Sequence, residues 1–113
     1  MPDCLFCKII QRSISAKFVF EDDDAVAFED VNPQAPTHVL IVPKKHIPGL
    51  ADTSDADAAL LGRLQRTSAV LAARLGLSDG FRLVANNGRG AGQTVDHLHY
   101  HLLGGRAMKW PPG

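Results

Sequence analysis

The segment DHLHYHLLGG, residues 96–105, places three of the chain's five histidines, His97, His99 and His101, at every second position. Side chains alternate between faces along an extended strand, so a strand over 96–103 would present all three imidazoles on one face. The other face would hold three apolar or aromatic residues, Leu98, Tyr100 and Leu102. Neutral imidazole is a nucleophile and imidazolium is an acid near pH 7. Together with the glycine-rich loop that precedes it, the spacing favours phosphoryl or nucleotidyl transfer over an exposed face that merely carries histidines.

One metal ion held by all three histidines is a further alternative, and strand geometry argues against it. The Cβ atoms of His97 and His101 lie on the order of 13 Å apart along a regular strand. Two nitrogens bound to one tetrahedral zinc ion lie about 3.4 Å apart. At most two neighbouring histidines can share an ion, which leaves at least one imidazole for another task.

A glycine-rich loop, NNGRGAGQT, directly precedes the histidines. Its glycines allow backbone N–H groups to turn inward around an anion and to stabilise charge on phosphoryl oxygens. The loop matches neither the P-loop pattern nor a full dinucleotide fingerprint, and taken alone it would be a plain turn between two strands. Joined directly to the histidines, it indicates a phosphate site.

Four further runs of residues predict the strands that must support this segment. The runs are β-branched and aromatic, with acidic, proline-containing or glycine-containing links between them. They cover residues 17–22, 25–31, 37–43 and 80–86. Because the links between the first three are short, those strands are expected to be antiparallel.

Two helices are predicted. A short one follows Asp3 as N-cap, with apolar residues on one side. A long one over 54–76 starts at Ser54, has Asp57 at the capping-box position, and stops at Gly76. We therefore expect an α+β fold with a five-stranded antiparallel sheet.

Composition limits the class of protein. The 113 residues fit a single domain over 1–113, and the formal net charge is zero, so no overall basic field would attract nucleic acid or an anionic membrane. The chain has no run of about 18 apolar residues and no leader-like N-terminus. A cytoplasmic location is expected.

Cys4 and Cys7 have the C-x-x-C spacing of half a zinc site. Two histidines would complete a Cys₂His₂ set, but the spacing does not identify which two. In a reducing compartment a structural disulfide is not expected, so reduced thiols without a ligand are the alternative.

The sequence HLHYHLL fits His-φ-His-φ-His-φ-φ, the signature of the histidine triad (HIT) superfamily. Over essentially the whole chain it resembles the Hint branch, through FEDVNPQAPTHVLIVPKKHI, VANNG, AGQTVDHLHYHLLGGR and WPPG. The resemblance implies a HIT fold and a purine nucleoside phosphoramidase. Such an enzyme hydrolyses adenosine or guanosine 5′-monophosphoramidates to the nucleoside monophosphate and an amine through a nucleotidyl-histidine intermediate. A homodimer joined through the long helix and the fourth strand is also implied.

The same resemblance assigns roles to individual residues. His99 corresponds to the nucleophile, His101 contacts the phosphate and assists, and His38 lies close to the same site. Contacts to the phosphate and the leaving group are implied for Asn86, the backbone of Gly92 and Gln93, and the Thr94 hydroxyl. The ribose hydroxyls would bind Asp30. The apolar wall around the base would consist of Phe6, Ile9, Phe28 and Val31.

Similarity to bacterial histidine triad proteins implies that His46 and His97 complete the zinc site with the two cysteines. Zinc there would hold the first helix to the sheet and would not take part in the chemistry. Two alternatives to the hydrolase stay open. One is a regulatory protein that binds AMP or GMP with little catalysis, and the other is a zinc-dependent phosphodiesterase.

Overall fold

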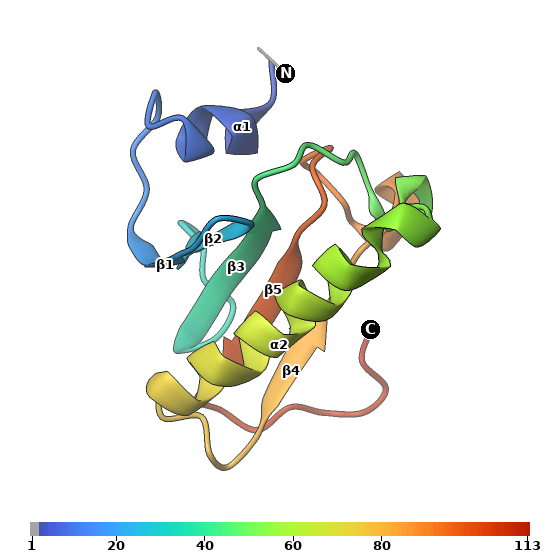
Figure 1. Cartoon of the computed structure of the whole chain (residues 1–113). Coiled ribbons are helices and arrows are strands. Elements are labelled where there is room, and N and C mark those ends of the chain that lie inside the picture. Colours follow the sequence, from blue (N-terminus) through green and yellow to red (C-terminus); the bar gives the residue numbers. More distant parts are fainter. Residues whose placement is uncertain (1–2) are drawn as a thin grey trace.

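The computed structural model describes residues 3–113 and contains a five-stranded antiparallel sheet with one short and one long α-helix (Figure 1). The strands lie in the order β1-β2-β3-β5-β4. The elements follow one another as α1 (Leu5–Ile10), β1 (Phe18–Glu21), β2 (Ala25–Glu29), β3 (Thr37–Pro43), α2 (Ala58–Arg74), β4 (Phe81–Val84) and β5 (Tyr100–Gly104). Short 3₁₀ turns cover Leu50–Asp52, Asp55–Asp57 and Arg89–Ala91. The predicted α+β fold is confirmed.

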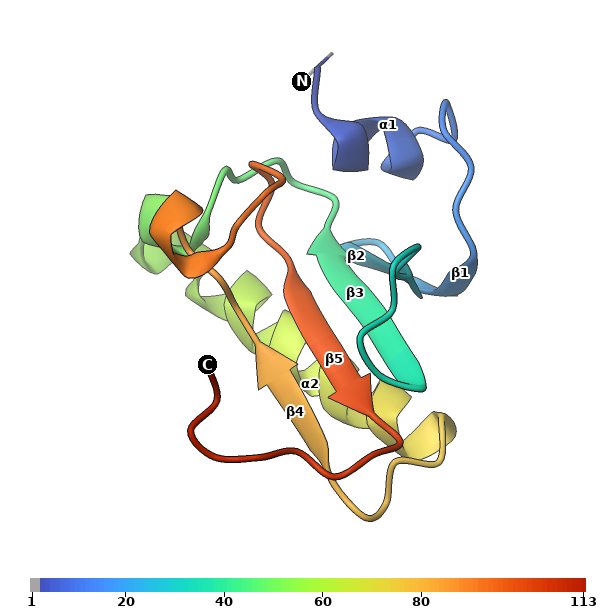
Figure 2. The ribbon, with the colours of Figure 1, turned by 180° about the vertical axis from the view of Figure 1, so that it is seen from behind.

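Successive strand residues point to opposite sides of the sheet, so the sheet has two faces to cover. Each face is covered by one of the two helices. Helix α2 packs against one face, and the core there includes Ala27, Val39, Ile41, Leu64, Leu71 and Leu102. Helix α1 packs against the other face, in a second core made of Phe6, Ile9, Val26, Phe28, Leu40 and Val42. Seen from behind in Figure 2, α1 lies at the end of the sheet where β3 ends and β5 begins.

The start of the first helix differs from the prediction. Cys4, not Asp3, is the N-cap of α1, since the Sγ atom of Cys4 accepts a hydrogen bond from the Cys7 N–H at 3.4 Å. A sulfur atom here replaces the usual oxygen acceptor of a cap. The consequence is that both cysteines belong to the first turn of α1.

The long helix begins nearly as predicted. The capping box between Ser54 and Asp57 is present, but the first turn is 3₁₀, and the α-helix runs over Ala58–Arg74. It ends before Gly76, which has a φ of 76°. Among residues 3–113, neither helix has the length and apolar character needed to cross a bilayer.

The histidine segment is a strand only in its second half, so the predicted strand over 96–103 is wrong before Tyr100. The β3–β5 ladder stops at the pair Ile41 and Tyr100. Further pairing would bring Leu98 opposite Pro43, which has no N–H to donate, and the Leu98 N–H instead donates to the Ile47 carbonyl at 2.6 Å. The alternation of faces persists all the same, because Leu98, Tyr100 and Leu102 belong to the core on the α2 side, while His99 and His101 line a pocket beside α1.

Candidate active site and metal centre

A pocket of about 380 Å³ opens beside α1, and His99 and His101 form part of its wall. This volume is in the usual range for small-molecule sites. The wall is otherwise mostly apolar and includes Leu5, Phe6, Ile9, Ile14, Phe28, Val31, Leu40 and Val95. Its polar part includes Asp30 and Thr94. A ligand with an apolar ring at one end and a polar group near the histidines matches this division.

The tautomer of His99 follows from its hydrogen bond. Its Nδ1 lies 2.7 Å from the carbonyl oxygen of His97, and since a carbonyl can only accept, Nδ1 carries the proton. The Phe6 ring packs edge-on against the imidazole with centroids 5.0 Å apart. Burial lowers the pKa of His99, so the ring is neutral near pH 7. Neutral His99 therefore keeps the lone pair on Nε2, which is what a nucleophile requires.

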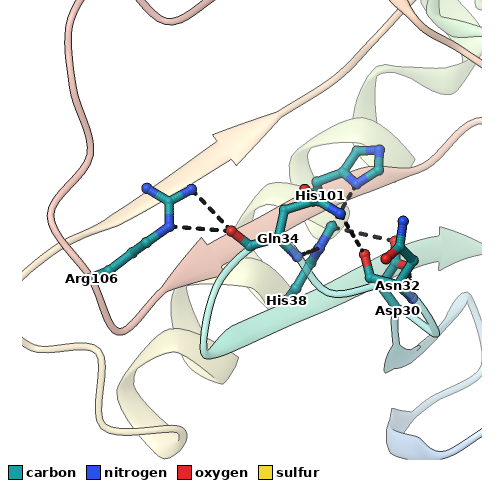
Figure 3. Close-up of polar contacts among 6 residues, drawn as sticks. All are labelled: Asp30, Asn32, Gln34, His38, His101 and Arg106. Atoms are coloured by element: carbon teal, nitrogen blue, oxygen red, sulfur yellow. Dashed lines mark hydrogen bonds and ion pairs between the residues drawn. The ribbon is translucent and has the colours of Figure 1, made fainter.

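His101 belongs to a hydrogen-bonded chain that begins in the loop between β2 and β3 (Figure 3). The Gln34 N–H donates to His38 Nδ1 at 3.0 Å, and His38 Nε2 lies 2.9 Å from His101 Nδ1. Because His38 Nδ1 is an acceptor, the proton of the neutral ring is on Nε2. The Nε2–H of His38 donates to His101 Nδ1. The proton of the neutral His101 ring is therefore on Nε2, which can act as a donor.

Asp30, His38 and His101 together have the spacing of a cation site, but the protonation of His38 argues against metal binding. Ligand atoms of Asp30, His38 and His101 all lie within 4.8 Å of one another. The nitrogen of His38 that faces Asp30, at 3.4 Å, is the protonated Nε2. A metal there would require the proton to move to Nδ1, where the Gln34 N–H already points. We assign these residues to hydrogen bonding and not to metal binding.

Four predicted residues lie outside the pocket wall. His38 is buried beside His101, as described above. Gln93 is also buried, and its side chain is used within the protein: Nε2 donates to the Pro48 and Val95 carbonyls and Oε1 accepts from the Gly88 N–H. Gly92, with a φ of 91°, is exposed and offers only backbone. Asn86 is half-buried, two residues after the end of β4.

Sequence reasoning missed several residues of the site. Leu5 fell within the predicted apolar side of the first helix, which was a usable signal, and Ile14, Leu40 and Val95 also line the pocket. Gln34 gave no signal, since its contribution to the histidine chain is a backbone N–H. A backbone donor can be assigned only once the loop that carries it has been placed.

A second cluster lies at the end of the sheet near α1 and consists of Cys4, Cys7, His46 and His97. The two Nδ1 atoms are 3.1 Å apart. The Nδ1 of His97 is 3.3 Å from Cys4 Sγ and 3.6 Å from Cys7 Sγ, and Cys7 Sγ is 3.4 Å from His46 Nδ1. Donor atoms around a tetrahedral zinc ion with two sulfurs and two nitrogens lie about 3.4 to 3.8 Å apart. The cluster has the donors and nearly the dimensions of a zinc site.

The protonation of His97 also suits a metal. Its Nε2 is 2.8 Å from the carbonyl oxygen of Pro43, so Nε2 carries the proton and Nδ1 keeps the lone pair that points at the cysteines. A carbonyl that orients a ligating histidine in this way is typical of metal sites. Burial lowers the pKa of His97 to about 4, which keeps the ring neutral. The residues therefore fit zinc, and His99 and His101 are not among its ligands.

The family model of the HIT domain matches residues 11–108 of this chain. The chain belongs to the HIT family. An HIT-like protein of Synechocystis is 57% identical over 111 residues, with 98% of this chain and 97% of that protein covered. A maize protein described as a 14 kDa zinc-binding protein is 48% identical over 111 residues, covering 96% of this chain and 87% of its own length.

Solved structures of HIT proteins have the same fold. A HIT family hydrolase from Legionella pneumophila superposes with a TM-score of 0.97 and 54% identity. The match covers 98% of this chain and 100% of that chain. A histidine triad nucleotide-binding protein from Candida albicans gives a TM-score of 0.83 at 34% identity, with 96% and 83% covered. The five-stranded sheet with one short and one long helix is thus the HIT fold, and the chain has the architecture of HIT family hydrolases.

Proposed function

We propose that this HIT protein is a purine nucleoside phosphoramidase of the Hint branch. It would cleave the P–N bond of adenosine or guanosine 5′-monophosphoramidates. The observation that carries the proposal is the hydrogen bond from His99 Nδ1 to the His97 carbonyl, which leaves Nε2 of a neutral imidazole free in the wall of a mostly apolar pocket. Similarity to a HIT family hydrolase and to a histidine triad nucleotide-binding protein supports it.

In the first step the His99 Nε2 lone pair attacks the α-phosphorus, an N–P bond forms, and the P–N bond to the amine breaks. The nucleotidyl-imidazole carries a positive charge, since Nδ1 keeps its proton, and the His97 carbonyl stabilises that charge. In the second step water attacks phosphorus and the N–P bond to His99 breaks. The leaving amine takes a proton from solvent water in the first step, and the attacking water returns a proton to solvent in the second. Over both steps, water thus supplies the proton that the amine takes and the hydroxyl that the nucleotide gains.

The other residues of the pocket would bind and orient the nucleotide. His101 would donate its Nε2 proton in a hydrogen bond to a phosphoryl oxygen, which stabilises charge in the transition state. The Thr94 hydroxyl and the backbone at Gly92 and Gln93 would contact the phosphate or the leaving group. Asp30 would accept hydrogen bonds from the ribose, and the base would lie against Phe6, Ile9, Phe28 and Val31, of which the first three are buried.

The proposal is tested by incubating the protein with adenosine 5′-monophosphoramidate and measuring AMP and amine release, with and without a zinc chelator. We expect turnover that persists when the chelator is added briefly at low temperature. Tight AMP binding without turnover would favour the nucleotide-binding alternative. Turnover abolished by chelation with the fold intact would favour the phosphodiesterase, in which metal contacts the phosphate.

Acid pH gives a second test of the nucleophile. Burial lowers the pKa of His99 below its ordinary value of 6.5. Burial and the neighbouring imidazoles of His99 and His38 lower the pKa of His101 to about 4. Both rings are therefore still mostly neutral at pH 6.5, and we expect the acid limb of the kcat/KM profile to lie below pH 6.5. A pH–rate profile with an acid limb at or above pH 6.5 would contradict this assignment.

We also propose that zinc bound by Cys4, Cys7, His46 and His97 has a structural role. When bound, it would supply charge neutralisation for two thiolates and a link between α1 and the ends of β3 and β5. Both cysteines belong to the first turn of α1, and Phe6 of the same helix packs against His99. Zinc would thus support the nucleotide pocket from outside it.

A homodimer is proposed as well. Strand β4 is an edge of the sheet, and unpaired edges require protection or a partner. Phe81 on this strand is 45% exposed and Trp110 in the tail is 81% exposed. A second copy of the chain pairing along β4 would cover such side chains. Sedimentation equilibrium is expected to give a dimer mass, and a monomer at micromolar concentration would refute it.

A further inference from the structure

Arg106 connects the chain after β5 with the loop between β2 and β3. Its Nε and Nη2 both donate to the carbonyl oxygen of Gln34, at 3.2 and 3.1 Å (Figure 3). Its Nη1 donates to the Ala107 carbonyl at 3.1 Å. The planar guanidinium is thus fixed on both sides, and its fork holds one carbonyl with a geometry that a lysine ammonium does not reproduce.

The residue before Arg106 makes a second contact with the same loop. Gly105 has a φ of 88°, and a Cβ atom placed on it would lie 2.9 Å from the Cβ atom of Pro36. The backbone can approach the loop this closely because residue 105 is glycine. Two neighbouring residues therefore hold the loop independently, one by packing and one by hydrogen bonds.

Gln34 connects the Arg106 hydrogen bonds to the histidines of the candidate active site. Its carbonyl accepts from Arg106, and its N–H donates to His38 Nδ1 at 3.0 Å. That N–H keeps the proton of His38 on Nε2, which lies 2.9 Å from His101 Nδ1. If Gln34 moved away, His38 could carry its proton on Nδ1, and His101 would then need its own proton on Nδ1. His101 Nε2 would become an acceptor and could no longer donate to a phosphoryl oxygen.

We propose that Arg106 is a positioning residue of the active site, which acts through Gln34 and His38 to keep the proton of His101 on Nε2. Arg106 is exposed, and the pocket wall formed by residues 3–113 does not include it, so it acts at a distance from the nucleotide. The effect on rate rests on the proposed phosphoramidase function. The effect on the imidazole tautomers does not.

The test compares three variants of the full chain with the wild type. Arg106→Met removes all donors and keeps the length of the side chain, and Arg106→Lys keeps the charge without the fork. Arg82→Met is the matched control, because Arg82 also binds a carbonyl of the C-terminal tail, that of Lys109 at 2.7 Å, but makes no contact with Gln34. For each protein, kcat and KM with adenosine 5′-monophosphoramidate, AMP affinity, and the ¹⁵N NMR tautomers of His38 and His101 are measured.

For Arg106→Met we expect kcat to fall about tenfold, a part of the roughly 10²–10³ that one hydrogen-bond donor to transition-state charge contributes. KM and AMP affinity should stay within about twofold, because only the His101 hydrogen bond to the phosphoryl oxygen is weakened, and that bond is strongest in the transition state. The Nδ1-protonated tautomers of His38 and His101 should become populated. Arg106→Lys should recover part of kcat, and Arg82→Met should match the wild type in every measurement.

Unchanged tautomers in Arg106→Met would overturn the proposal whether or not kcat falls. An equal loss of kcat in Arg82→Met would overturn it too, because packing of the tail would then explain the effect. If the wild type shows no turnover, the proposed function fails, and the tautomers alone decide the role of Arg106. Shifted tautomers without turnover would still support it.

Discussion

Replacing His99 by asparagine is expected to lower kcat for adenosine 5′-monophosphoramidate by about 10⁴-fold or more, as loss of a covalent nucleophile does in other hydrolases. The asparagine amide nitrogen can take the place of Nδ1 and keep the hydrogen bond to the His97 carbonyl. It offers nothing at the position of Nε2. The variant thus removes the attacking atom and changes the pocket little, and steady-state kinetics with purified protein measure the loss.

Controls for His99→Asn separate loss of the nucleophile from loss of the pocket. AMP affinity, measured by calorimetry, should stay within about tenfold of the wild type, because the apolar wall and Asp30 are retained. Zinc content should be unchanged, since the cluster that fits zinc uses Cys4, Cys7, His46 and His97. Turnover within tenfold of the wild type would show that the nucleophile lies elsewhere.

Removing both cysteines, as in Cys4→Ser with Cys7→Ser, should abolish tight zinc binding and destabilise the fold. A ligand present at a thousand times its Kd stabilises the native state by about 4 kcal/mol. In a chain of this size, losing it should lower Tm on the order of 10 °C or more. Calorimetry on metal-free and zinc-loaded protein measures the difference. KM should rise as well, because α1 also provides Phe6 and Ile9 of the pocket wall.

The matched control for the cysteine variant is a serine substitution at an exposed position near α1, where nothing ligates a metal. Gln11→Ser, just after the helix, should leave zinc content and Tm unchanged. Wild-type protein stripped by a chelator should show the same loss of Tm as the double variant, and zinc should restore it. A double variant that retains a full equivalent of zinc would disprove the site.

The sequence predicted most of the sheet because the decisive signals are local. Strand β3 has the predicted bounds, Thr37–Pro43, since an apolar run of β-branched residues ends at a proline. The capping box of Ser54 and Asp57 also formed as predicted. The absence of a strand before Tyr100 was not predictable in the same way. It depends on where Pro43 and Ile47 lie in the folded chain.

The candidate site shows the same division between local and distant information. Histidine spacing excluded a single metal for all three imidazoles, and the structure agrees, since His97 lies with the cysteines while His101 lies with His38. The tautomers of His97 and His101 could not be predicted, because they are set by the Pro43 carbonyl and the His38 imidazole, which lie far from them in sequence. Gln34 and Arg106 are 72 residues apart in sequence, and their contact has no signature in either segment.

The central claim is that His99 becomes covalently bound to the nucleotide. The direct measurement mixes wild-type protein with radiolabelled adenosine 5′-monophosphoramidate, quenches within milliseconds at alkaline pH to preserve the N–P bond, and maps the label by peptide mass spectrometry. We expect AMP on His99, and no label in His99→Asn. Label on His97, His101 or no residue at all during active turnover would contradict the account.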